Sequence, residues 1–149
     1  MPRRNISRSD RARYYLAAAN FWFEVVQLQK ARCQQEEKSG VESRADLSFY
    51  VVAVQRLLEV ARMTRDRLGI REIGQAIDEF DARWPKFREL RNLEEHILGP
   101  SLNSPMGFTY FGDFVGDLLP GGAVDYVIDV RDTRVIDRLH EKLCHLLAE

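Results

Sequence analysis

The chain has 149 residues, 45% of them hydrophobic and 30% charged, with a formal net charge of -1, so it is long enough for one domain with a substantial core and too apolar for a disordered protein. It has no run of about 20 apolar residues that could span a bilayer, and its basic N-terminus lacks the apolar segment and cleavage site of a secretory signal. We therefore expect a single cytoplasmic domain over residues 1–149, with no membrane association.

The first predicted element is a long helix that starts at Ser9 or Asp10 and continues to about Glu37, after a flexible basic tail over residues 1–9. Ser and Asp are both good caps for a helix N-terminus. Apolar residues recur at intervals of three and four, which is typical of a helix with one buried face: Tyr14, Ala18, Phe21, Val25 and Leu28. The rings of Phe21-Trp22-Phe23 diverge by about 100° from one residue to the next, so at least one of them should contact another helix or another subunit.

Three more helices are predicted before the first change of pattern. The second spans about 44–68 and ends at Gly69, the third spans 70–84 and is stopped by Pro85, and the fourth runs from Pro85 to Leu98. Proline interrupts a helix that precedes it and is well tolerated in the first turn of the helix that follows. The short connections predict antiparallel neighbours, and the four helices should form a bundle.

Residues 106–130 change to the alternating pattern of strands. Phe108–Phe111 and Val124–Val130 are the two predicted strands of a β-hairpin insertion, with Pro120-Gly121-Gly122 between them. One face of the second strand should carry four apolar side chains: Val124, Tyr126, Ile128 and Val130. Asp132 can cap a final helix that returns to the bundle. The predicted fold class is therefore mainly α, an up-and-down bundle of four to five helices with a small β-hairpin inserted before the last helix.

Charged residues are unevenly distributed along the chain. Residues 1–13 carry five arginines and one aspartate, and residues 56–71 carry five arginines and two acids, so both segments could contact phosphates. In the second segment Arg62 and Arg65 are the candidate substrate-binding residues. Solvated helix faces would show the same clusters. Residues 113–137 hold six aspartates and two arginines, so this segment should lie away from a polyanion.

The two cysteines, Cys33 and Cys144, are too few for a disulfide framework, and reduced, partly buried thiols are expected. His140 and Cys144 are four residues apart and could share a helix face. A metal site needs three or four ligands, however, and His145 points elsewhere on the helix. The sequence therefore predicts no metal site and no cofactor.

The most informative stretch is Arg91-Asn92-Leu93-Glu94-Glu95-His96, near the end of the fourth predicted helix. Arginine binds phosphate oxygens, asparagine can orient a hydroxyl or a phosphate, and histidine exchanges protons near neutral pH. On an ideal helix the three candidates Arg91, Asn92 and His96 lie on the polar side, opposite the apolar residues. An ordinary solvent-exposed helix face could contain the same residues.

The spacing of Arg91, Asn92 and His96 resembles the Arg-polar-x-x-x-His signature of the HEPN superfamily, small helical proteins that include many metal-independent ribonucleases of toxin and defence systems. The order of elements over residues 10–147 is also similar to that of bacterial members. The resemblance implies a composite site, in which two copies of the motif meet across a homodimer, and a partner such as an antitoxin or a neighbouring defence protein.

The expected function is a metal-independent endoribonuclease of toxin or defence type, in which His96 moves the proton, Arg91 offsets charge on the phosphorane and Asn92 orients the reacting groups. Two alternatives remain open. One is a catalytically inactive module that holds a nucleotide or a partner, with Glu95 paired to Arg91. The other is a structural or regulatory helical dimer whose interface is formed by Phe21-Trp22-Phe23 and the hairpin.

Overall fold

The computed structural model describes residues 5–95 and 108–148. Its elements, in chain order, are α1 (Arg8–Cys33), α2 (Gly40–Arg67), the 3-10 helix η1 (Arg71–Ile73), α3 (Gly74–Arg83), α4 (Phe87–Glu95), β1 (Phe108–Phe111), β2 (Phe114–Leu118), β3 (Val124–Asp129) and α5 (Arg134–Leu147). The predicted fold class is confirmed: the protein is mainly α, and a small antiparallel sheet precedes the last helix. None of the helices in the described ranges is both long and apolar enough to span a bilayer.

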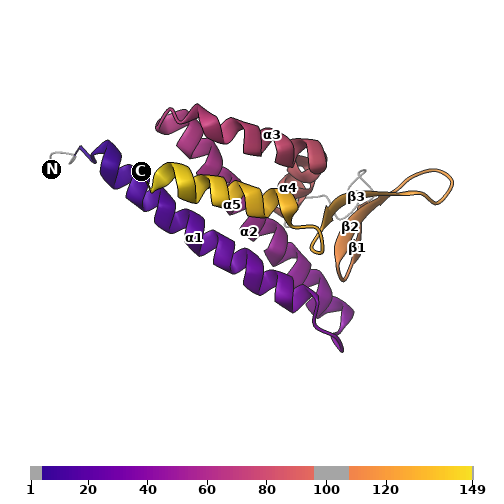
Figure 1. Ribbon diagram of the computed structural model, residues 1–149. Helices are drawn as coiled ribbons and strands as arrows, with labels where there is room; N and C mark the ends of the chain where they lie inside the picture. Colours follow the sequence, from indigo (N-terminus) through magenta and orange to yellow (C-terminus); the bar gives the residue numbers. More distant parts are fainter. Residues whose placement is uncertain (1–4, 96–107, 149) are drawn as a thin grey trace.

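Helix α2 is the centre of the molecule. It packs against α1 along most of its length and also contacts α3, α4 and α5, and its buried side chains cover more than half of the helix circumference. In Figure 1 the long α1 and α2 cross the molecule side by side, α5 lies between α1 and α3, and the sheet stands at the end opposite the chain termini. The bundle therefore forms one continuous core, with the sheet attached at one end.

The start and end of α1 differ from the prediction. Ser7, not Ser9 or Asp10, is the N-cap, because its hydroxyl oxygen accepts a hydrogen bond from the backbone N–H of Asp10 at 3.1 Å and donates one to the Asp10 carboxylate at 2.7 Å. The predicted tail over residues 1–9 therefore extends too far into the helix; residues 1–4 lie outside the described part. The helix also stops at Cys33 rather than at Glu37.

The buried face of α1 was predicted correctly only in part: Ala18 and Val25 are half-buried and pack against the core. Tyr14, Phe21 and Leu28 of the predicted stripe are 70%, 57% and 58% exposed. The core instead receives the stripe displaced by one residue: Tyr15, Ala19, Val26 and Cys33. Both stripes have helical spacing, so the pattern alone does not choose between them, and the small side chains of Ala19 and Val26 allow α1 to lie close to its neighbours. A row of large apolar side chains is thereby left on the surface.

The sheet has three strands rather than the two of the predicted hairpin, in the order β1-β2-β3. Strand β2 was missed because Gly116 and Asp117 interrupt its apolar alternation, although the Gly112-Asp113 pair that precedes it is a known two-residue hairpin turn. The predicted Pro120-Gly121-Gly122 turn joins β2 to β3, and both glycines have positive φ angles. The segment is therefore a meander with two hairpins.

The predicted apolar face of the last strand is broken by a register shift. The pairing of β2 with β3 changes between Val115 and Gly116, with the result that the adjacent residues Val127 and Ile128 are both fully buried while Tyr126 is 42% exposed. A side chain at Gly116 would come within 2.6 Å of a Val124 methyl group. Glycine is therefore required at this irregularity because the strands approach closely there.

Candidate functional site

Helix α4 carries the predicted motif. Its apolar residues Phe87 and Leu90 are buried against the core, Arg91 is half-buried, and Asn92 is exposed. The predicted division of this helix into an apolar and a polar side is thus present for these residues. His96, the third candidate catalytic residue, lies outside the described residues, as do the side chains of Glu94 and Glu95.

Arg91 has an unusual environment for a surface arginine. Its Nε atom is buried, and within the described part of the chain it has no hydrogen-bond acceptor. No carboxylate of the described side chains forms an ion pair with it, although many other arginines are paired in this way. A buried donor without an acceptor costs about 1–3 kcal/mol, so the position favours an incoming anion that supplies the missing acceptor.

The beginning of α4 is fixed to the sheet by a shared cation. The ammonium of Lys86 lies 2.7 Å from the Asp117 carboxylate on β2 and 3.0 Å from that of Asp125 on β3. The hydrogen bonds that the ammonium donates to both carboxylates hold the pKa of Lys86 above its usual range. Just before it, Arg83 lies over the Trp84 ring and pairs with Asp132 at 2.6 Å. These contacts fix the direction in which α4 carries Arg91 and Asn92.

Arg62 and Arg65, the predicted substrate-binding pair, lie on the last turns of α2 and are both already in ion pairs. Arg62 is 3.8 Å from Asp81 on α3, and Arg65 is 2.8 Å from its neighbour Asp66. The hydrogen bond that Arg65 donates to the Asp66 carboxylate raises the pKa of Arg65. Within the described residues neither arginine forms a hydrogen bond or an ion pair with Arg91, so the structure does not join this pair to the motif on α4.

A second group of arginines gathers where α1 begins and α2 ends. We call this surface the basic end: Arg8, Arg11, Arg13 and Arg67. All four are exposed, and among the described side chains none of them forms an ion pair. The basic segments at residues 1–13 and 56–71 are visible in the sequence, but their proximity is not, because it depends on the antiparallel packing of α1 and α2.

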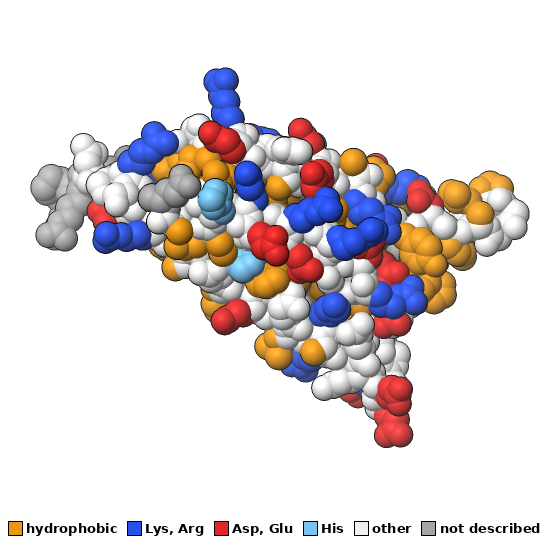
Figure 2. Space-filling model, viewed as in Figure 1, with side chains coloured by type: hydrophobic (Ala, Val, Ile, Leu, Met, Phe, Trp, Pro, Cys, Tyr) orange, Lys and Arg blue, Asp and Glu red, His pale blue; other side chains and the backbone are white. Residues whose placement is uncertain are grey.

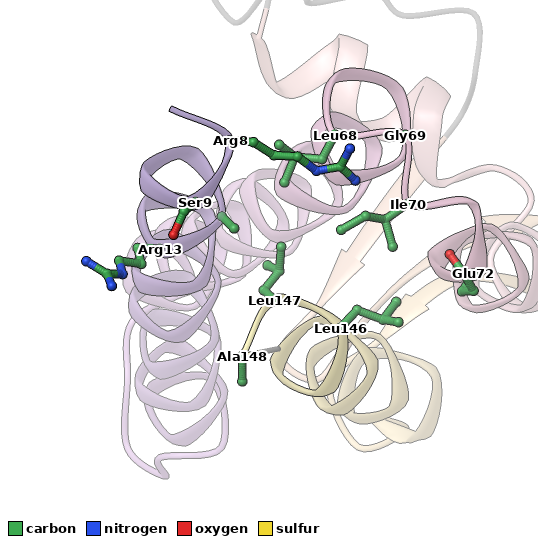
Figure 3. A pocket seen from close by; sticks show the side chains of 11 residues that line it. Arg8, Ser9, Arg13, Leu68, Gly69, Ile70, Glu72, Leu146, Leu147 and Ala148 are labelled. Atoms are coloured by element: carbon green, nitrogen blue, oxygen red, sulfur yellow. The ribbon is translucent and has the colours of Figure 1, made fainter. Parts of the chain in front are cut away.

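Two pockets of the basic end lie on the two sides of α1. One pocket of about 720 Å³ is bordered by Arg8, by Leu68 at the end of α2 and by Leu147 at the end of α5. In Figure 3 the Arg8 side chain extends from α1 toward Leu68, while Arg13 points outward. The other pocket, of about 770 Å³, lies between Arg11 and Arg67. Both therefore combine apolar walls with arginine at the rim.

The aspartates of residues 113–137 are largely neutralised. Asp117 and Asp125 share Lys86, Asp129 pairs with Arg131 at 2.7 Å, and Asp132 pairs with Arg83 and Arg134. Figure 2 shows basic and acidic side chains intermixed over the region where α5 begins beside the sheet. This segment consequently presents mixed charge rather than the uniformly negative surface that the sequence suggested.

Another polar cluster joins α1 to α5. The His140 Nε2 atom lies 2.9 Å from the Asn20 Oδ1 atom, and the Cys144 Sγ atom lies 3.3 Å from each of these two atoms. The His140 ring stacks on Phe23 at 3.8 Å between centroids. Burial lowers the pKa of His140 and raises that of the Cys144 thiol. Across the described ranges, no three His, Cys, Asp or Glu side chains converge as a metal-binding group.

Comparison with protein-family models, with curated proteins and with solved structures gave no match for this chain. The HEPN resemblance therefore rests on Arg91, Asn92 and His96 and on the order of elements. It remains a hypothesis.

Proposed function

We propose that the protein is a metal-independent endoribonuclease of toxin or defence type that acts as a homodimer in the cytoplasm. The observation that carries this proposal is Arg91, whose buried Nε lacks an acceptor in the described structure. It stands beside the exposed Asn92 on a helix that is held in place at its other end.

The reaction assigned to the motif is transesterification at an RNA phosphate. The 2′-hydroxyl oxygen attacks the phosphorus, the bond from phosphorus to the 5′-oxygen breaks, and the products are a 2′,3′-cyclic phosphate and a free 5′-hydroxyl. His96 takes the proton of the 2′-hydroxyl or returns one to the leaving 5′-oxygen, and Arg91 binds the developing negative charge. Asn92 orients the phosphate. DNA lacks the attacking hydroxyl and is not a substrate.

The basic end is the surface we assign to binding the rest of the RNA. Its four arginines form no ion pair within the described residues, although Glu72 lines the same pocket as Arg8, whereas the predicted pair Arg62 and Arg65 is engaged with Asp81 and Asp66. Phosphate contacts made by arginine provide affinity without sequence preference. We therefore replace Arg62 and Arg65 by the basic end as the principal phosphate-binding surface.

The dimer is assigned to the exposed apolar row of α1. Tyr14, Phe21 and Leu28 are spaced by seven residues, as in helices that pair along a seam, and on the adjacent α2 the side chains of Val41 and Phe49 are 80% and 58% exposed. A surface of this kind is typical of an interface. Helix α4 packs against α2, and the composite site additionally requires the two α4 helices to face each other across this dimer.

The test is cleavage of single-stranded RNA by the purified protein in the presence of EDTA. We expect cyclic or 3′-phosphate ends and no cleavage of DNA of the same sequence. Arg91→Ala and His96→Ala should each lower the rate by about 10²-fold or more. The matched control is Arg88→Ala, an exposed arginine on the same helix, which should retain activity.

Three results would count against the proposal. These are cleavage that requires added magnesium, equal rates for the Arg91→Ala and Arg88→Ala variants, and no cleavage of any RNA tested. The last result, combined with tight RNA binding, would identify the inactive binding module instead.

A further inference from the structure

Three polar atoms form a triangle on the surface between α1 and α5. They are the Oδ1 atom of Asn20, the Nε2 atom of His140 and the Sγ atom of Cys144. The three distances are 2.9, 3.3 and 3.3 Å. The Asn20 amide oxygen accepts hydrogen bonds from the imidazole and from the thiol. An oxygen, a nitrogen and a sulfur atom are thus within hydrogen-bonding distance of one another, although Asn20 is 120 and 124 residues away from His140 and Cys144 in the sequence.

The triangle is held in place by its surroundings. His140 and Cys144 are one turn apart on α5, so their side chains project from the same face. The Phe23 ring lies parallel to the imidazole, with an interplanar angle of 5°, and fixes the plane of His140. Helices α1 and α5 pack directly against each other. The cluster is therefore prearranged by the fold and does not depend on flexible segments.

We propose that Asn20, His140 and Cys144 bind one Zn²⁺ ion, with water completing a tetrahedral shell. Thiolate and imidazole are the ligands that zinc prefers. Around a tetrahedral zinc ion, sulfur, nitrogen and oxygen ligands lie about 3.4–3.6 Å apart, so small side-chain rotations from the observed distances suffice. Asn20 and Cys144 are at least partly exposed, which leaves a side open for water.

When the zinc ion binds, it takes the place of the two hydrogen atoms that now form hydrogen bonds to Asn20, one on the thiol and one on the imidazole. The thiol proton leaves to solvent, and the imidazole proton moves from Nε2 to Nδ1, so that Nε2 and Sγ both face the ion. One proton is thus released for each ion bound. Asp137 and Glu141, which act electrostatically on His140, add negative charge near the ion. The site is independent of the proposed nuclease chemistry, which uses no metal.

The experiment is titration of the untagged protein with Co²⁺ as a spectroscopic probe, followed by displacement with Zn²⁺. We expect a thiolate-to-cobalt charge-transfer band in the near ultraviolet at one equivalent, its loss on zinc addition, and release of one proton per zinc ion. Cys144→Ser should abolish the band. His140→Gln and Asn20→Ala should weaken zinc binding, the histidine variant by about 10-fold or more.

Two controls separate this site from the other thiol and imidazole groups. Cys33→Ser and His145→Gln should leave the band and the stoichiometry unchanged. Zinc should also raise the Tm of the wild-type protein, because the ion joins α1 to α5 in the folded state only, and should not raise that of Cys144→Ser. Absence of the band in wild-type protein, its persistence in Cys144→Ser, or its loss in Cys33→Ser would overturn the proposal.

Discussion

The two thiols of the chain have different environments. Cys33 is 4% exposed at the end of α1, and burial raises its pKa to about 11, whereas Cys144 is half-buried on α5. At pH 8 a thiol with a raised pKa is almost entirely protonated, and only the thiolate is a nucleophile. Burial and protonation therefore both protect Cys33.

We expect a thiol-alkylating reagent at pH 8 to modify Cys144 first and Cys33 only after unfolding. Mass spectrometry of the intact protein should show one added group in buffer and two in guanidinium chloride. Peptide mapping should assign the first group to Cys144. Equal reaction of both thiols in the native protein would mean that the end of α1 opens more readily than its packing indicates.

For single residues, the sequence predicted the helix face on which a side chain lies, but not the residues that it contacts from other parts of the chain. It placed Arg91 and Asn92 on the polar side of a helix, because helical periodicity is a local property. It did not reveal the buried Nε of Arg91, nor that Asn20 lies beside His140, because both facts depend on packing between distant segments. The pairing of Arg62 with Asp81 was missed for the same reason.

Helix α1 shows most clearly that a local sequence pattern does not determine which face of a helix is buried. Two apolar stripes, one residue apart, satisfy the same spacing, and the buried one contains Ala19, which is 0% exposed. The larger side chains of the other stripe would hold α1 further from α2. The helix orientation is therefore determined by the close approach of two helices, which is a tertiary effect.

Substituting two neighbouring alanines tests this orientation. Ala19→Leu should destabilise the protein by about 1–3 kcal/mol, because the added atoms have no space between α1 and its neighbours. Ala17→Leu, on the exposed side, should change the free energy of unfolding by less than about 0.5 kcal/mol. Chemical denaturation of both variants measures the difference. The opposite ranking would show that the originally predicted stripe faces the core.

Strand β2 could have been predicted, and β3 was predicted to within one residue of its end. The Gly112-Asp113 turn was visible in the sequence, whereas the register shift at Val115 and Gly116 is visible only in the paired strands. The start of α1 could not be predicted to the residue, because Ser7, Ser9 and Asp10 are all acceptable N-caps. In the structure the Ser7 hydroxyl accepts the hydrogen bond from the Asp10 backbone N–H.

For the whole molecule, the exposed apolar row of α1 predicts a homodimer. Sedimentation should give about twice the 17.3 kDa of one chain. Phe21→Glu should produce monomers without loss of folding, because the side chain is 57% exposed. Leu118→Glu, which is also exposed but lies on the sheet, should leave the dimer intact. Dissociation by Leu118→Glu alone would instead place the interface at the sheet.

The basic end predicts the salt dependence of RNA binding. Replacing Arg8, Arg11 and Arg13 together by alanine should weaken binding to all RNA sequences alike and reduce the slope of log K against log salt by about 2, since each phosphate contact on a single strand contributes about 0.7. The matched variant Arg62→Ala with Arg65→Ala should change the slope little. Fluorescence anisotropy at several salt concentrations measures both. An equal effect of the two variants would reject the distinction between them.

The central position of α2 also determines how the protein unfolds. Helix α2 carries more buried side chains than any other described helix and contacts α1, α3, α4 and α5, so it loses most of its packing once these neighbours leave. Its backbone amides should therefore exchange with deuterium only through global unfolding, whereas those at the start of α1 should exchange through local fraying. The same dependence makes unfolding all-or-none, with no stable fragment that retains only the sheet or only α1 and α5.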